Sequence, residues 1–195
     1  AGTCCAAVWH TSSIFVEATI EGLSAHASRP HLGVNAAEGA ALFTLAVAAI
    51  KLNPNLTWSC TVTGIDAMSS ASNIIPAKAR IMIDARELMD VMLAKTDAAV
   101  KGAAAAIGGK GSTRLMGTVI PAAEYDEELV DEVRESITRV LGADKLAHDC
   151  GAGGEDFHFF KKHKPSIKAA YFGVGAGCAP GLHSRNMNFE SRWLE

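Results

Sequence analysis

The stretch Gly22-Leu-Ser-Ala-His-Ala-Ser-Arg-Pro-His-Leu-Gly-Val-Asn35 connects a strand-like run to a helix-like run. Loops at such junctions place polar side chains where a ligand can reach them, while the flanking elements hold them in position. His26 and His31 are five residues apart, which fits neither a helical metal pair nor a His-x-His strand pair. The loop alone therefore does not predict a metal site, and the alternative is that both are ordinary loop histidines.

The segments on either side of this loop have clear periodicities. Residues 13–21 alternate in the manner of a half-buried strand, with one apolar face. That face holds Ile14, Val16, Ala18 and Ile20. Asn35 followed by Glu38 is typical of a helix N-cap and its reciprocal partner. The helix is expected to stop at Asn53-Pro54 and to bury a stripe of Leu42, Leu45, Ala49 and Ile50.

The next segments complete a β-α-β-β-α-β order, which is a split βαβ unit. A second strand is predicted to turn Leu56, Trp58, Cys60 and Val62 inward, and a third strand contains Ile81, Ile83 and Ala85. A helix over 90–107, with Met92, Thr96, Val100, Ala103 and Ile107 along one stripe, precedes a strand over 113–120. The second strand would lie at a sheet edge without a protecting Lys or Pro, so it, or the helix beside it, is expected to pair with a second copy.

The remainder of the chain has a different character. An amphipathic helix is predicted over 126–141, with Val130, Val133, Ile137 and Val140 buried. A short helix over 156–162 follows a glycine-rich turn. The apolar run 169–174 does not alternate, which favours a strand that is buried on both faces. The loop glycines at 173, 175, 177 and 181 lack the Gly-x-Gly-x-x-Gly spacing of a dinucleotide site.

The composition of the 195 residues excludes several classes of function. Hydrophobic residues account for 49% and charged residues for 20%, the balance of an ordinary globular protein. The formal net charge is −3 and no basic stripe occurs, so nucleic acid is not an expected partner. No apolar run is long enough to span a membrane. Five cysteines without a Cys-x-x-Cys pair predict free thiols and a cytoplasmic protein.

Five further residues are candidates for chemistry. Asn73 and Arg86 flank the third strand, and the guanidinium fork of Arg86 could grip a carboxylate through two parallel bonds. His183 ends a glycine-rich loop that follows an apolar strand, where α/β sheets present ligands. Glu155 and Asp156 are adjacent, so their side chains diverge and cannot face each other as an acid pair. Taken singly, Asn73 and Arg86 could equally be surface residues, His183 structural and Asp156 a helix cap.

Five motifs in order resemble peptidase family M20, and in particular its amidohydrolase branch of hippurate, aminobenzoyl-glutamate and indole-acetyl-amino-acid hydrolases. They are the stretch 22–35, Asn73-Ile-Ile-Pro-Ala-Lys-Ala79, Ile83-Asp-Ala-Arg86, Gly154-Glu-Asp-Phe157 and Gly181-Leu-His183. The resemblance implies an α+β fold in three parts. Residues 1–11 would end one segment of a catalytic domain, 12–120 would form a ferredoxin-like lid that pairs into a homodimer, and 121–195 would be the C-terminal part of an α/β zinc-peptidase-like catalytic domain.

The same resemblance implies roles for individual residues. His26 would polarise the scissile carbonyl in the partner subunit's active site. Asn73 and Arg86 would hold the substrate carboxylate, and Gly175 would also bind substrate. His183 would be the last ligand of a centre of two divalent metal ions, zinc or manganese. Glu155 would support that centre without ligating it.

The sequence departs from the family in lacking a His-x-Asp motif, and the N-terminal half that carries the family's remaining metal ligands and its Glu general base is not part of these 195 residues. Two functions therefore stay open. In the first, the chain is the C-terminal part of a metal-dependent amidohydrolase that cleaves an N-acyl amino acid or dipeptide with a metal-activated water. In the second, it is a non-catalytic fragment that dimerises or binds carboxylates and holds no metal. A lone remnant after Pro121 would leave apolar surface exposed near residues 169–174.

Overall fold

The computed structural model describes residues 1–151 and 153–194, and the chain divides into two compact units. One is the continuous segment 12–119, which we call the inserted unit. The other combines 1–11 with the chain from 120 onward, and we call it the flanking unit. No helix among the described residues has both the length and the apolar character needed to cross a membrane.

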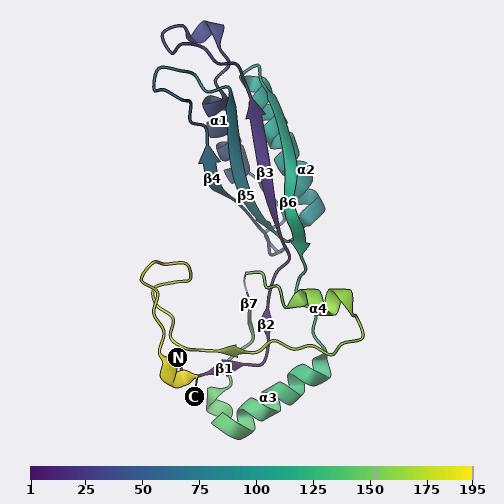
Figure 1. Ribbon diagram of the computed structural model, residues 1–195. Coiled ribbons are helices and arrows are strands. Elements are labelled where there is room, and N and C mark those ends of the chain that lie inside the picture. The colour runs from purple at the N-terminus through teal and green to yellow at the C-terminus, as the bar shows by residue number, and fades with distance from the viewer. Residues whose placement is uncertain (152, 195) are drawn as a thin grey trace. The chain divides into compact units, whose positions relative to one another are not determined.

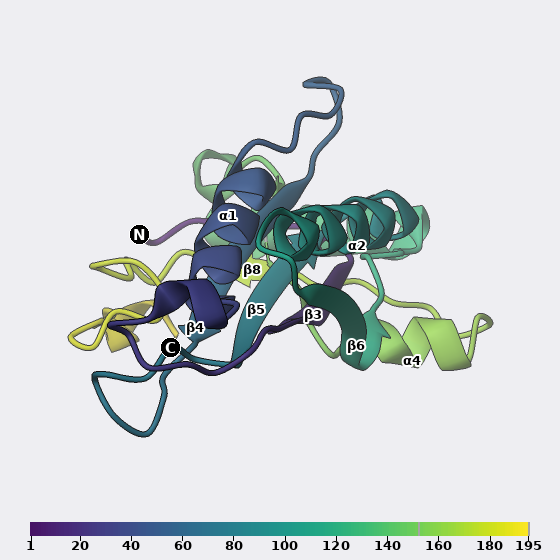
Figure 2. The same ribbon diagram turned by 90° about the horizontal axis from the view of Figure 1, so that it is seen from above.

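The inserted unit is a four-stranded sheet in the order β4-β5-β3-β6, with two helices on one face (Figures 1 and 2). Its elements are β3 (Ser13–Glu21), η1 (Pro30–Leu32), α1 (Ala36–Ala48), β4 (Ser59–Asp66), β5 (Lys78–Arg86), α2 (Met89–Ala106) and β6 (Lys110–Ile120). Strand β5 is antiparallel to both β3 and β4. The strand-helix-strand-strand-helix-strand order and the edge position of β4 predicted from the sequence are confirmed.

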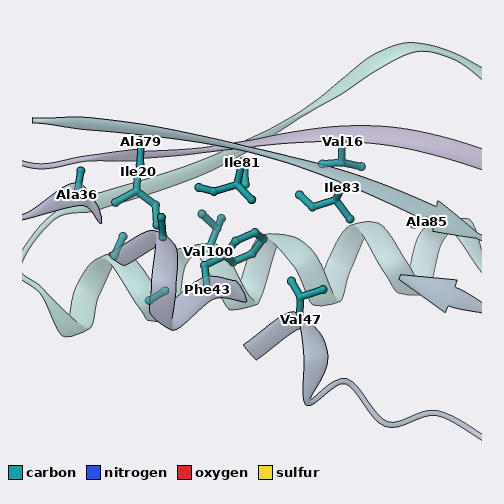
Figure 3. Close-up of a cluster of buried hydrophobic side chains, with 14 of the residues drawn as sticks. Val16, Ile20, Ala36, Phe43, Val47, Ala79, Ile81, Ile83, Ala85 and Val100 are labelled. Atoms are coloured by element: carbon teal, nitrogen blue, oxygen red, sulfur yellow. The ribbon is translucent and has the colours of Figure 1, made fainter. Parts of the chain in front are cut away.

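The core of the inserted unit lies between the sheet and the helices (Figure 3). Alternation along β3 and β5 sends every second side chain into this core. Phe43 from α1 and Val100 from α2 fill the space beneath Val16, Ile20, Ile81 and Ile83. The exposed fraction of each of these six residues is 1% or less. Asn35 caps α1 as expected, since its Oδ1 accepts the backbone N–H of Ala37 and its amide donates to Glu38.

Helix α1 buries a different face from the one the sequence predicted. Phe43 and Val47 point into the core, whereas Leu42 and Leu45 are exposed, Leu45 to 68%. The helix also ends at Ala48, before Asn53-Pro54. Nearly every position of α1 is apolar or small, so a 3.6-residue period fits more than one face, and packing against β3 and β5 decides which one is buried. Leu56 likewise precedes β4 and is exposed, while Trp58, Cys60 and Val62 pack on the core as predicted.

The flanking unit contains short strands and helices. They are β1 (Cys4–Cys5), β2 (Val8–Trp9), α3 (Glu127–Leu141), η2 (Ala143–Lys145), β7 (Cys150–Gly151), α4 (His158–His163), β8 (Gly173–Val174) and η3 (Ser191–Trp193). Strand β1 pairs with β8 and β2 pairs with β7, over two residues each. Ala6, Ala7, Val130 and Ile137 form the small core.

Three predictions for this unit need correction. Val140 is 75% exposed, so the buried stripe of α3 stops short of its last turn. Only Gly173–Val174 of the run 169–174 is a strand, and Val174 is 38% exposed, so the strand is not buried on both faces. Helix α4 begins at His158 and Asp156 does not cap it through its side chain. The expected exposed apolar surface is confirmed by Phe172 and Val174.

Candidate functional site

The loop 22–35 folds against the chain that precedes β5, through backbone hydrogen bonds. The N–H of Ala27 donates to the carbonyl of Asn73 over 2.8 Å, and the N–H of Ile75 donates to the carbonyl of Ala25 over 2.8 Å. Gly22 lets the two ends of the loop approach each other, because a Cβ there would lie 2.1 Å from the carbonyl oxygen of Val34. Two motifs nearly 50 residues apart are thus joined at one end of the sheet.

The imidazole of His26 is oriented by Ser28. The backbone N–H of Ser28 points to Nδ1 of His26 over 3.1 Å, and the Ser28 hydroxyl lies 2.8 Å from the same nitrogen. A backbone N–H can only donate, so Nδ1 must be the acceptor and the proton of the neutral ring must be on Nε2. The exposed Nε2–H is therefore the donor that His26 presents to a ligand.

Asn73 contacts that same nitrogen, with 3.4 Å between its side-chain amide and Nε2 of His26. The two ends of a carboxamide exchange by rotation about its last torsion, and the hydrogen-bond network decides which end faces a neighbour. Because Nε2 carries the proton, the oxygen of Asn73 is the complementary end. The structure thus brings together two of the residues that the sequence singled out.

Arg86 lies far from this pair. It ends β5 whereas Asn73 precedes the start of the same strand, and nine strand residues at about 3.4 Å each separate the ends by roughly 27 Å. The guanidinium of Arg86 is held by Asp84, with Nε and Nη2 each 2.6 Å from a carboxylate oxygen. One copy of the chain therefore cannot place Asn73 and Arg86 on the same carboxylate.

The other candidates belong to the flanking unit. His183 is exposed, in a turn between Ala179 and Asn188, and has a positive φ of 65°. Gly175 is tied to the N-terminal segment, since it accepts from the N–H of Gly2 and donates to the carbonyl of Thr3. These two bonds give Gly175 a structural role in its own unit.

A histidine pair that the sequence did not reveal lies near Glu155. Nδ1 of His10 is 2.9 Å from Nε2 of His158, whose residue is only 2% exposed. Burial lowers the pKa of both rings, and the negative charge of Glu155 opposes this shift. Tyr171 packs edge-on against His10. His10 and His158 are 148 residues apart, so no local sequence pattern could have indicated the pair. Ser28 is only two positions from His26, so its contact with that ring could have been found from local spacing.

The described residues do not form a metal centre by themselves. A catalytic zinc usually takes three protein ligands, and no group of three or more His, Cys, Asp or Glu side chains with suitable placement occurs within 1–151 and 153–194. His183 is a single exposed imidazole. The donor set of this chain thus does not fit the two-metal centre that the sequence resemblance implies.

Comparison with known proteins agrees with this architecture. The sequence model of the M20 peptidase dimerisation domain matches residues 8–112. An uncharacterized hydrolase, y4tI, from Sinorhizobium fredii is 30% identical over 180 residues, which is 89% of this chain and 44% of that protein.

Solved structures show the same fold at lower identity. An aminobenzoyl-glutamate utilization protein from Klebsiella pneumoniae has a TM-score of 0.69 and 24% identity, covering 88% of this chain and 46% of its own. YxeP from Bacillus subtilis, described as a dinuclear metal-binding peptidase from the M20 family, has a TM-score of 0.69 and 16% identity. The match covers 99% of this chain and 49% of YxeP. This chain spans about half the length of these proteins. It belongs to the M20 peptidase family and corresponds to the C-terminal portion that carries the dimerisation domain.

Proposed function

We propose that this chain supplies the lid and the C-terminal part of an M20-type amidohydrolase that cleaves the amide bond of an N-acyl amino acid or dipeptide. The observation that carries the proposal is the exposed His26 ring, which Ser28 orients so that Nε2 carries the proton. A positioned donor of this kind stabilises the negative charge that develops on a carbonyl oxygen during hydrolysis. Family members are hydrolases, as the names of the matched relatives state.

The roles follow from what each side chain can do. His26 would donate to the oxyanion, and Asn73 beside it would bind the substrate carboxylate. Arg86 would bind the terminal carboxylate through the guanidinium N–H groups that Asp84 leaves unused. His183 would contribute one imidazole to a centre of two zinc or manganese ions, Glu155 would support it, and Gly175 would line the substrate site. The remaining metal ligands would come from residues outside this chain.

A homodimer through the inserted unit would reconcile the distance between Arg86 and the His26–Asn73 pair. A two-fold axis repeats each surface on the partner copy, so one copy could supply His26 and Asn73 while the other supplies Arg86. The edge strand β4 and the exposed Leu42 and Leu45 of the neighbouring helix α1 offer a surface for this pairing. The free cysteines agree with a cytoplasmic location.

Activity tests this proposal when the chain is co-expressed with the part of the Sinorhizobium relative that it does not match. N-acyl amino acids should be hydrolysed only with zinc or manganese, and chelation should abolish turnover. His26→Ala should lower kcat by about 10²–10³, the range for loss of one oxyanion donor. His31→Ala, in the same loop, is the matched control and should leave kcat unchanged. An equal loss in both variants would contradict the role given to His26.

Mixing two inactive variants tests the shared site. A dimer of one His26→Ala copy and one Arg86→Ala copy contains one intact site, so a random mixture should recover roughly a quarter of the activity. Absence of recovery, with sedimentation showing mixed dimers, would place both residues in one copy. For the dimer itself, Leu45→Lys should shift sedimentation toward monomer, whereas Val140→Lys in the flanking unit should not.

The second candidate function is dimerisation or carboxylate binding without chemistry. It is favoured because no group of three or more His, Cys, Asp or Glu side chains within 1–151 and 153–194 is placed to hold a metal. Elemental analysis of the purified chain distinguishes the two functions. Two metals per chain would support catalysis by this chain alone, and none would support the second.

A further inference from the structure

Two cysteine thiols of the flanking unit lie side by side. The sulfur of Cys5, on β1, is 3.5 Å from the sulfur of Cys150, on β7, although the residues are 145 positions apart. The backbone holds them there, because the N–H of Cys150 donates to the carbonyl of Ala7, and β7 pairs with β2 in the register Val8 to Cys150. The contact therefore follows from strand pairing and not from a chance approach of two loops.

The two thiols differ in their accessibility. Cys5 is 6% exposed, whereas Cys150 is an exposed residue. Burial and the neighbouring Cys150 both raise the pKa of the Cys5 thiol, so Cys5 stays protonated near neutral pH. Gly173 packs closely over it, since a Cβ at that position would lie 2.8 Å from the Cys5 sulfur. An oxidant from solvent thus reaches Cys150 first and finds Cys5 directly behind it.

We propose that Cys150 and Cys5 form a redox-active pair that a peroxide converts into a disulfide. The Cys150 thiolate attacks the peroxide, the O–O bond breaks, and Cys150 becomes a sulfenic acid while hydroxide leaves. The Cys5 thiol then loses its proton and attacks the Cys150 sulfur, and water leaves as the S–S bond forms. The peroxide takes the two electrons, and any thiol reductant returns the pair to its starting state.

The geometry favours this pair over the other cysteines. The sulfur atoms need to approach from 3.5 Å to the S–S bond length of about 2.05 Å, a movement on the scale of side-chain rotation. The side chain of Cys4 lies on the opposite face of β1 from that of Cys5 and lines an apolar groove beside α3. Cys60 lies in the inserted unit, where burial raises its thiol pKa to about 11. Cys178 is exposed on a separate loop.

Oxidation would have a local structural effect. Cys150 begins the glycine-rich turn that leads to Glu155 and to the buried His158. A covalent link to β1 would fix the start of that turn.

Hydrogen peroxide and peptide mapping test the proposal on the whole chain. The native chain should give a Cys5–Cys150 cross-linked peptide that a reductant cleaves. After Cys150→Ser or prior alkylation of Cys150, Cys5 should remain reduced and should not move to another disulfide. Cys178→Ser, which removes another exposed thiol, is the matched control and should leave the yield unchanged.

Three results would overturn the assignment. One is the oxidation of Cys5 to the same extent after Cys150 is blocked; another is a dominant disulfide through Cys4 or Cys178; the third is oxidation of Cys150 to sulfinic acid with Cys5 left reduced. Peroxide treatment of the chain unfolded in urea provides the reference, because loss of strand pairing should scatter the disulfides among all five cysteines. Alkylation needs no variant, so the test does not depend on Cys5 or Cys150 tolerating substitution.

Discussion

The inserted unit and the flanking unit bury their apolar residues to very different degrees. In the first, β3 and β5 pair along nine residues and two helices cover one face of the sheet, so large side chains such as Phe43 are completely buried. In the second, the strand pairs are two residues long, the core consists of Ala6, Ala7, Val130 and Ile137, and Phe172 is 54% exposed.

This difference shows where the free energy of folding arises. In a sheet with a covered face, every inward residue contributes free energy of folding by burying apolar surface. Strand pairs of two residues bury little apolar surface and leave helix faces uncovered. The described residues of the flanking unit also line a groove of about 520 Å³ beside α3. Related proteins are about twice as long as this chain.

The largest effect is expected when the two units are separated. Residues 12–119 expressed alone should unfold in one cooperative transition, because their core is complete. Residues 1–11 joined to 120–194 by a short flexible linker should show no sharp transition, since the small core cannot offset the loss of chain entropy. Circular dichroism during heating measures both, and a steep transition in the joined piece would remove the contrast.

Valine substitutions sharpen the comparison within helices. Val100→Ala in α2 should lower the free energy of unfolding by about 2–3 kcal/mol, from two buried methyl groups and the cavity that they leave. Val91→Ala, on the same helix but 41% exposed, should change it by less than about 0.5 kcal/mol.

The equivalent change in the flanking unit is Val130→Ala in α3, which should cost about 1 kcal/mol because its sparse surroundings collapse more easily. Urea denaturation followed by fluorescence and circular dichroism measures all three variants. A cost at Val130 equal to that at Val100 would contradict the idea that the two cores differ in packing.

The sequence predicted the inserted unit well, for physical reasons. Alternation along β3 and β5 and the Asn35 cap are local signals, and the elements that pack against β3, β5 and α1 belong to the same chain. The buried face of α1 was predicted wrongly because Leu45 and Phe43 are equally apolar, and only the shape of the sheet surface selects Phe43. The prediction for the run 169–174 was wrong because apolar character alone does not show whether a segment forms a strand with both faces covered.

The candidate site could be predicted only in part. The resemblance named His26 and Asn73, but periodicity could not show that the loops carrying them are joined by backbone bonds. The carboxylate that holds Arg86 is two residues away, on Asp84, which alternation places on the same face of the strand. The His10–His158 and Cys5–Cys150 pairs depend on long-range strand pairing, which leaves no trace in local spacing.

A smaller effect than that of the Val100 cavity is expected from pH. Burial lowers the pKa of His10 and His158 below the ordinary 6.5, so the unfolded chain binds more protons than the folded chain near pH 6. The contribution of these two histidines to the free energy of unfolding should therefore be complete above about pH 6.5. It should fall as the pH is lowered toward their folded-state pKa values. Glu155 opposes this loss, and burial raises the pKa of Tyr125, the tyrosine that packs against His158.

Denaturation at about pH 7.5 and about pH 5.5 isolates this contribution, because the paired carboxylates titrate at lower pH. The double variant His10→Gln with His158→Gln should flatten the dependence. His31→Gln, in the exposed turn of the inserted unit, should keep it. A dependence that survives in the double variant would assign the effect to other groups.

The smallest change in stability is expected at the exposed end of α3. Val140→Lys removes an apolar side chain from the groove that Val133, Ile137 and Phe172 also line. It also places a cation in the last turn, where the helix dipole favours it. The free energy of unfolding should stay within about 0.5 kcal/mol, while the fluorescence of an apolar dye bound to the native chain should fall by roughly half. Val91→Lys, at an exposed valine of the inserted unit, should leave the dye signal unchanged. Equal losses in the two variants would mean that exposed apolar surface is spread over both units, and the contrast between a complete core and an uncovered one would then not hold.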